Sequence, residues 1–193
     1  MVALLNSPRI MAVAEFLAWD APSGHRWQLV DGEPTAMAPA SRTHNTMVAE
    51  LAALIRNHLL AQGSHCVAVV APGVVPRARS DDNFRIPDLG VTCSRYETEE
   101  YTLDEPVLLV EILSPSNQAE TWTNIWAYMT IPSLREILVL RSTSIGAQVL
   151  RRGADGSWPD RPMTLTGGVL DLESIGFQVE LAALYRGTRL AAG

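Results

Sequence analysis

Two acids near the middle of the chain have the residue types and surroundings of a metal site. The apolar run from Val107 to Val110 ends on Glu111, a pattern that predicts a buried strand with a charge near its end. A buried carboxylate without a partner costs several kcal/mol, roughly, or takes up a proton. A second acid, Asp88, follows Pro87 at the middle of a predicted neighbouring strand. Two converging acids are a common way to hold a hard divalent cation, so Asp88 and Glu111 are candidate ligands.

The same acids also have a purely structural interpretation. Asp88 could cap a turn after Pro87, and Glu111 could pair with an arginine. The chain has no lysine, so all 15 of its Lys and Arg residues are arginine. A solvated surface accounts best for most of these arginines. Arg85, just before the Pro87-Asp88 step, is the one that we assign to substrate binding.

The composition is typical of one globular α/β domain spanning residues 1–193, with 47% hydrophobic residues. A net charge of −6 counts against non-specific coating of DNA, although it leaves a local basic face open. No apolar run approaches the eighteen or so residues needed to cross a bilayer, so no membrane association is expected. Cys66 and Cys93 have no metal-ligand spacing, which predicts buried reduced thiols and a cytoplasmic protein.

Local signals predict helices and strands along the chain. Asp31-Gly32 is the strongest hairpin signal, and Ser41 or Thr43 can cap a long helix that ends at Gly63. The expected helices cover residues 12–19, 43–61, 117–129 and 180–185; the expected strands cover 27–30, 35–38, 65–70, 73–76, 86–93, 107–113, 136–140 and 147–150. This order predicts helices packed on a central sheet.

Taken together, the motifs resemble a known family. They are Ala14-Glu15-Phe16-Leu17, Arg26-Trp27-Gln28-Leu29-Val30-Asp31-Gly32-Glu33, Met37-Ala38-Pro39-Ala40 with His44, Pro87-Asp88, Val110-Glu111-Ile112-Leu113-Ser114-Pro115-Ser116, and Tyr128 followed by the strand at 136–140. In this order they resemble the Uma family of bacterial restriction endonucleases, within the PD-(D/E)XK nuclease superfamily. The resemblance implies a restriction-endonuclease-like fold, with a four-stranded mixed sheet flanked by helices.

The resemblance also implies a metal centre and roles around it. Asp88, Glu111 and the backbone carbonyl of Ile112 would hold Mg²⁺ or Mn²⁺. Family members usually carry Glu where this chain has Gln28, and lysine where it has Asn124. The lysine positions the attacking water and stabilises transition-state charge, so its loss could cost roughly two to three orders of magnitude in rate. Some restriction enzymes of the superfamily use Glu, Gln or Asn there, and Asn124 and Gln28 are therefore kept as catalytic candidates.

Other residues of the motifs have two interpretations each. His44 could contact a phosphate, or it could cap or pack at the start of the long helix. Ser114 and Ser116 lack the glycine-flanked elbow of a nucleophile, so a turn or N-cap role is favoured.

Three functions from different classes follow from these residues. The first is a metal-dependent endonuclease that cleaves phosphodiester bonds in DNA with an altered active site. The second is a catalytically degenerate module that keeps the nuclease fold for binding or assembly, as the missing lysine and the acidic charge suggest. The third is a metal-dependent hydrolase of a phosphate ester outside nucleic acids. Exposed apolar surface would favour a homodimer.

Overall fold

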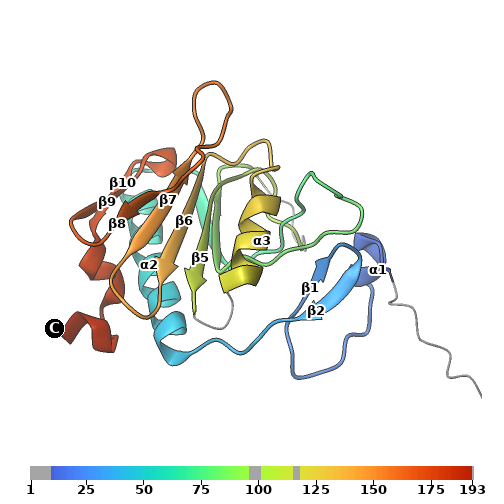
Figure 1. The fold of residues 1–193 in the computed structure, drawn as a ribbon. Coiled ribbons are helices and arrows are strands. Elements are labelled where there is room, and N and C mark those ends of the chain that lie inside the picture. Colours follow the sequence, from blue (N-terminus) through green and yellow to red (C-terminus); the bar gives the residue numbers. More distant parts are fainter. Residues whose placement is uncertain (1–9, 96–100, 115–117, 193) are drawn as a thin grey trace, which may run out of the picture.

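The computed structural model describes residues 10–95, 101–114 and 118–192 and contains a mixed α/β arrangement around a central sheet (Figure 1). The helices are α1 (Val13–Leu17), α2 (Arg42–Ala61) and α3 (Gln118–Tyr128), with 3-10 helices at Glu173–Ile175, Leu181–Tyr185 and Arg189–Ala192. The strands are β1 (Trp27–Val30), β2 (Glu33–Ala36), β3 (Val67–Val70), β4 (Leu89–Thr92), β5 (Pro106–Leu113), β6 (Glu136–Arg141), β7 (Ala147–Arg151), β8 (Met163–Leu165), β9 (Val169–Leu172) and β10 (Phe177–Glu180). The predicted α/β class, with helices packed on a central mixed sheet, is confirmed.

The central sheet has six strands in the order β3-β4-β5-β6-β7-β8, two more than the resemblance implied. The pair β5–β6 is parallel, and the other neighbours are antiparallel. The predicted strand at 86–93 is shorter, since β4 begins after Pro87, which has no amide hydrogen to donate to the ladder. Asp88 therefore lies immediately before β4 rather than at the middle of a strand.

Helix α2 begins and ends where local chemistry predicts. The side chain of Ser41 accepts a hydrogen bond from the amide of His44, which satisfies one free donor of the first turn. Gly63 follows the helix with a φ of +60°, a left-handed conformation that glycine adopts without steric cost. Ser41 rather than Thr43 is thus the N-cap.

The β1–β2 hairpin turns at Asp31-Gly32, with Val30 paired to Glu33. Both turn residues have positive φ, 51° and 84°, as a two-residue hairpin loop with this sequence requires. The hairpin is fastened to the rest of the chain through Leu29 and Phe84, whose backbones exchange two hydrogen bonds of 2.8 and 3.0 Å. In Figure 1 the hairpin and α1 lie together to one side of the sheet.

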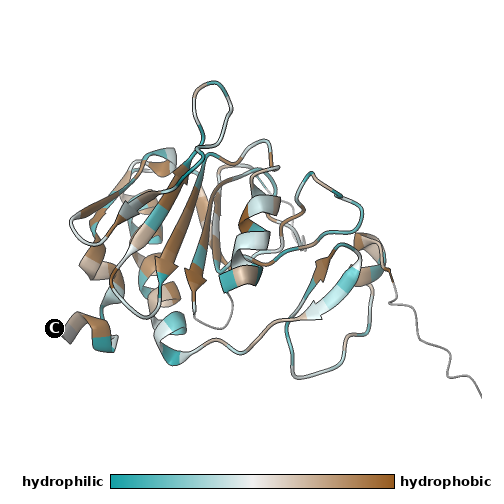
Figure 2. Cartoon of the chain, viewed as in Figure 1, coloured by the Kyte–Doolittle hydropathy of each residue, from teal (hydrophilic) through white to brown (hydrophobic). Residues whose placement is uncertain are grey.

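Two apolar layers cover the faces of the sheet. On one face α2 packs over alternate residues of β5, namely Leu108, Val110 and Ile112. On the other face α3 packs over Leu109 and Leu113. The central strands β5 and β6 are accordingly coloured as hydrophobic over much of their length (Figure 2). Glu111 belongs by alternation to the α3 face, so a charged group lies inside an apolar layer.

The prediction of reduced cysteines is wrong for this structure, because Cys66 and Cys93 form a disulfide. The register of β3 and β4 pairs Val67 with Thr92, so the cysteines are the next opposed positions. They lie 27 residues apart in sequence, and only strand pairing brings them together. Among the residues that the structure describes, no helix is long and apolar enough to span a membrane.

Candidate active site

The antiparallel register of β4 and β5 brings the two predicted acids together. Leu89 pairs with Val110, so Asp88 and Glu111 are the next opposed positions beyond the ladder. Oδ2 of Asp88 accepts a 2.7 Å hydrogen bond from the backbone amide of Ile112, the residue after Glu111. The carboxylate of Asp88 is thereby held against the end of β5.

His44 holds the same carboxylate from the side of α2. Its Nε2 lies 2.8 Å from Oδ1 of Asp88, and it donates to that oxygen when it carries the proton. His44 as a residue is only 9% exposed, so this contact is largely shielded from solvent. His44 is thus both the first-turn residue capped by Ser41 and a partner of the candidate metal ligand.

Glu111 is contacted from the α3 layer. The hydroxyl of Tyr128 donates a 2.8 Å hydrogen bond to Oε1 of Glu111, and both residues are buried. Burial, and next the negative charge of Asp88, raise the pKa of Glu111 well above its ordinary value, while hydrogen bonds from Tyr128 and Asn124 oppose the rise. Burial and the charge of Glu111 likewise raise the pKa of Tyr128.

A buried arginine is connected to the site through Asn124. Arg85 is 3% exposed, and its Nη1 donates a 2.8 Å hydrogen bond to Oδ1 of Asn124 on α3. Its Nε and Nη2 both donate to Oδ1 of Asn83, at 3.1 and 2.7 Å. Burial lowers the pKa of Arg85, an effect that the charges of Tyr128, Asp31 and Glu120 oppose. The solvated surface position that accounts for most arginines of the chain therefore does not apply to Arg85.

Gln28 closes the site from the hairpin. It is fully buried, and its Nε2 donates a 2.8 Å hydrogen bond to Oε1 of Glu120 in the first turn of α3. Its Oε1 is buried and has no hydrogen-bond partner among the residues that the structure describes. A buried amide oxygen left in this way favours a ligand or water that the protein atoms do not supply. The hydrogen bonds between Leu29 and Phe84 explain how the hairpin reaches the sheet here.

The structure therefore gathers the predicted site residues from separate elements. Asp88 and Glu111 meet across β4 and β5, His44 arrives from α2, and Asn124 with Arg85 forms a hydrogen-bonded pair beside them. By contrast Arg79, six residues before Arg85, is exposed and pairs with Asp31 and Asp82. Pro115 and Ser116 of the family motif lie outside the described residues.

Sequence reasoning missed two members of the site, Asn83 and the hydroxyl of Tyr128. The signal for Tyr128 was present, because residues 124 and 128 are four apart and share one face of α3. Asn83 had no such signal. Its Oδ1 accepts from Arg85, while its Nδ2 donates to Asp31 and to the backbone carbonyl of Arg79.

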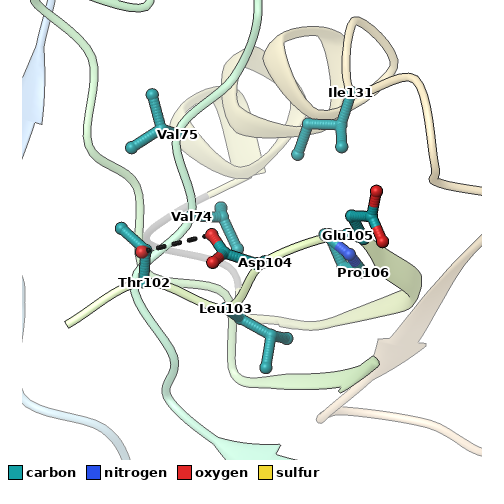
Figure 3. A pocket seen from close by; sticks show the side chains of 8 residues that line it. All are labelled: Val74, Val75, Thr102, Leu103, Asp104, Glu105, Pro106 and Ile131. Carbon is teal, nitrogen blue, oxygen red and sulfur yellow. Dashed lines mark hydrogen bonds between the residues drawn. The ribbon is translucent and has the colours of Figure 1, made fainter. Parts of the chain in front are cut away.

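A small pocket of about 150 Å³ lies elsewhere, under the segment that leads into β5 (Figure 3). Its lining is Val74, Val75, Thr102, Leu103, Asp104, Glu105, Pro106 and Ile131. Thr102 and Asp104 are joined within it by a 3.4 Å hydrogen bond. None of the candidate site residues lines this pocket, so it gives no support to the acid pair.

Comparison with known proteins places the chain in a family. Residues 13–183 match the family model Uma2, described as "putative restriction endonuclease". The chain belongs to this family. An uncharacterised protein of the cyanobacterium Synechocystis sp. is 29% identical over 175 residues, which are 90% of each chain.

A solved structure shares the fold of this Uma2 member. It is the crystal structure of a protein from Anabaena variabilis described as "a putative nuclease belonging to DUF820". The TM-score is 0.73 at 16% identity, and the match covers 91% of this chain and 97% of the other. At this identity the likeness establishes the fold alone.

Proposed function

We propose that the protein is a metal-dependent nuclease that hydrolyses phosphodiester bonds in DNA. The observation that carries the proposal is the register that opposes Asp88 and Glu111, with Asp88 bound to the amide of Ile112. The family description supports the same chemistry, and restriction endonucleases typically use divalent metal ions.

The donor set suits a hard cation. Two carboxylates and the carbonyl of Ile112 offer oxygen atoms, which Mg²⁺ and Mn²⁺ prefer. A carboxylate has about four acceptor positions, and the hydrogen bonds from Ile112 and His44 to Asp88 use two of them. A cation here would offset the repulsion between Asp88 and Glu111 that helps raise the pKa of Glu111.

Such an ion supplies Lewis acidity, which eases deprotonation of the attacking water and neutralises charge on the phosphate. The chain's own residues orient the reactants. His44 fixes the carboxylate of Asp88, and Tyr128 fixes that of Glu111. Gln28 presents a buried amide oxygen that can accept from the attacking water or the substrate.

The positive charge that the family places on a lysine comes here from Arg85. Asn124 accepts from Arg85 through Oδ1, so its amide hydrogens are directed toward other groups, of which Glu111 is one. The guanidinium therefore lies directly behind the amide that occupies the lysine position. Arg85 and Asn124 act as a pair in this proposal, with the arginine stabilising negative charge that develops on the phosphate.

Calorimetric titration with Mn²⁺ and Mg²⁺ tests the metal centre without knowledge of the substrate. The wild type is expected to show one saturable site that Asp88→Ala abolishes. Asp160→Ala is the matched control, because it removes an exposed acid by the same substitution. Cleavage of plasmid and single-stranded DNA with either ion is the companion assay, and a wild type that cuts neither would reject the enzymatic proposal.

A charge swap tests the role of Arg85. Arg85→Gln is expected to lower the cleavage rate by about 10²- to 10³-fold, the scale of one lost electrostatic contact in an active site. Adding Asn124→Lys to that variant returns a cation to the same place and should recover most of the loss. A double variant as slow as the single one would show that Arg85 acts through packing rather than charge.

A binding module that keeps the fold without catalysis is the second candidate function. The observation that favours it is that Asp88 and Glu111 already have protein partners, His44 with the Ile112 amide and Tyr128 respectively. In that case neither ion would bind saturably at millimolar concentration, and Asp88→Asn would leave the physiological behaviour intact.

A further inference from the structure

The disulfide lies at the far end of β4 from the candidate active site. Cys93 follows the last residue of this strand, whereas Asp88 precedes the first. At about 3.4 Å per residue the two positions are roughly 17 Å apart. Any chemistry at the cysteines is therefore separate from the acid pair.

A histidine accompanies the two sulfur atoms. One ligand atom each from His65, Cys66 and Cys93 lie within 4.8 Å of one another. Among the described residues, no other group of three His, Cys, Asp or Glu side chains has its ligand atoms this close together. His65 is exposed and both cysteines are half-buried, so solutes can reach the group. The group sits at the start of β3, the edge strand of the sheet.

We propose that reduction of the Cys66–Cys93 disulfide creates a zinc site whose ligands are the two thiolates and the imidazole of His65. Two sulfurs and one nitrogen form a ligand set that zinc binds with a fourth position left for water. Thiolates on one zinc ion lie about 3.8 Å apart, from Zn–S bonds of about 2.3 Å in a tetrahedron. The Cα atoms of Cys66 and Cys93 lie 3.9 Å apart, and the Cβ atoms of disulfide-bonded cysteines lie about 3.5–4.5 Å apart, so side-chain rotation brings the reduced sulfurs to this spacing.

The disulfide state and the zinc-bound state differ by a two-electron reduction followed by metal binding. A dithiol reductant gives two electrons and two protons to the disulfide, which becomes two thiols, and the dithiol becomes its own disulfide. Zinc binding then displaces one proton from each thiol, so two protons are released per ion. In a reducing compartment the sulfurs would be thiols, and the metal would hold β3 and β4 together in place of the covalent bond.

The pairing of β3 and β4 explains why a metal could replace the disulfide without a change of fold. Backbone hydrogen bonding runs from Val67–Thr92 to Val70–Leu89, so the strands stay aligned when the sulfurs separate. The side chain of Ser64 accepts from the amide of Cys66, which fixes the turn that carries His65.

Cobalt(II) titration of the full chain tests the proposal, because thiolate–cobalt absorption reports the ligands directly. The protein is first reduced with a phosphine, which is removed, and the titration is done without oxygen. The reduced wild type is expected to bind one Co²⁺ with a thiolate charge-transfer band that Zn²⁺ abolishes. The oxidised wild type should show no band.

Variants assign the ligands and separate this site from the active site. Cys66→Ser should remove the band, and His65→Ala should weaken binding at least tenfold, while the control His25→Ala, at another exposed histidine, leaves it unchanged. Asp88→Ala should keep the band even where it loses Mn²⁺ binding, so the two proposals fail independently. No band in the reduced wild type, an equal band in Cys66→Ser, or loss of the fold on reduction by far-ultraviolet circular dichroism would overturn the proposal.

Discussion

Replacing Glu111 by glutamine should make the metal-free protein more stable, and increasingly so as the pH rises. Burial and the charge of Asp88 raise the pKa of Glu111 in the native state above the ordinary value of 4.5. Between the unfolded and native pKa values the native state holds a proton that the unfolded state has lost. The free energy of unfolding of the wild type therefore falls with rising pH across this interval.

The magnitude follows from one proton. The stability attached to Glu111 is fully present below the unfolded pKa and is lost as the pH rises to the native pKa, at up to about 1.4 kcal/mol per pH unit. Two pH units inside the interval correspond to about 2.7 kcal/mol. Glutamine has nearly the same shape, keeps an acceptor for the hydroxyl of Tyr128 and does not titrate, so this loss disappears in Glu111→Gln.

Urea denaturation in chelator-treated buffers from about pH 5 to pH 8 measures the effect. The free-energy difference between Glu111→Gln and wild type should grow with pH, whereas Glu33→Gln, at an exposed position, should run parallel to wild type. Millimolar Mn²⁺ should then stabilise the wild type at the upper end and leave Glu111→Gln unchanged. A difference that stays constant with pH would refute the reasoning that burial and the charge of Asp88 raise the pKa of Glu111 in the native state.

Two further substitutions test what holds the scaffold of the site. Glu136→Ala should lower the free energy of unfolding by about 3 kcal/mol in urea denaturation, because Glu136 is 1% exposed and accepts hydrogen bonds from Arg151 and two backbone amides. Glu173 is the other acidic partner of Arg151, and its side chain is 60% exposed. Glu173→Ala should therefore lower the free energy of unfolding by less than about 1 kcal/mol. Gly73→Ala should cost about 1–3 kcal/mol, because the added Cβ would overlap a phenylalanine ring, while Gly167→Ala has open space and should change the melting temperature little. Equal losses within either pair would contradict the assignment.

The sequence was a good guide wherever one short segment determines the structure. Asp31-Gly32 predicted a hairpin, and the hairpin turns there with both residues at positive φ. Ser41 was an expected cap for the long helix, and it caps His44. The strand predicted at residues 107–113 was confirmed as β5 (Pro106–Leu113), and its alternate residues pack against two different layers. Each of these depends on residues within about four positions of one another.

The errors concern pairings between distant segments. The cysteines were predicted to be reduced because they have no metal-ligand spacing in the sequence, but the register of β3 and β4 makes them neighbours that form a disulfide. The strand at 86–93 was predicted too long, since Pro87 interrupts the ladder. β8, β9 and β10 were not predicted, because each is three or four residues long and carries exposed side chains. Register is fixed by the whole sheet, and a single segment does not contain it.

Asn124 shows most clearly why a site cannot be interpreted one position at a time. On the sequence alone, an amide at the lysine position signifies a lost charge and a slower or inactive enzyme. In the folded chain that amide accepts a 2.8 Å hydrogen bond from Arg85, which arrives from a segment 39 residues earlier. The guanidinium of Arg85 reaches α3 because the asparagine there is short and accepts its hydrogen bond. In the proposed site Arg85 and Asn124 act as a pair, so a variant that alters only one of them should cleave more slowly than a variant that alters both.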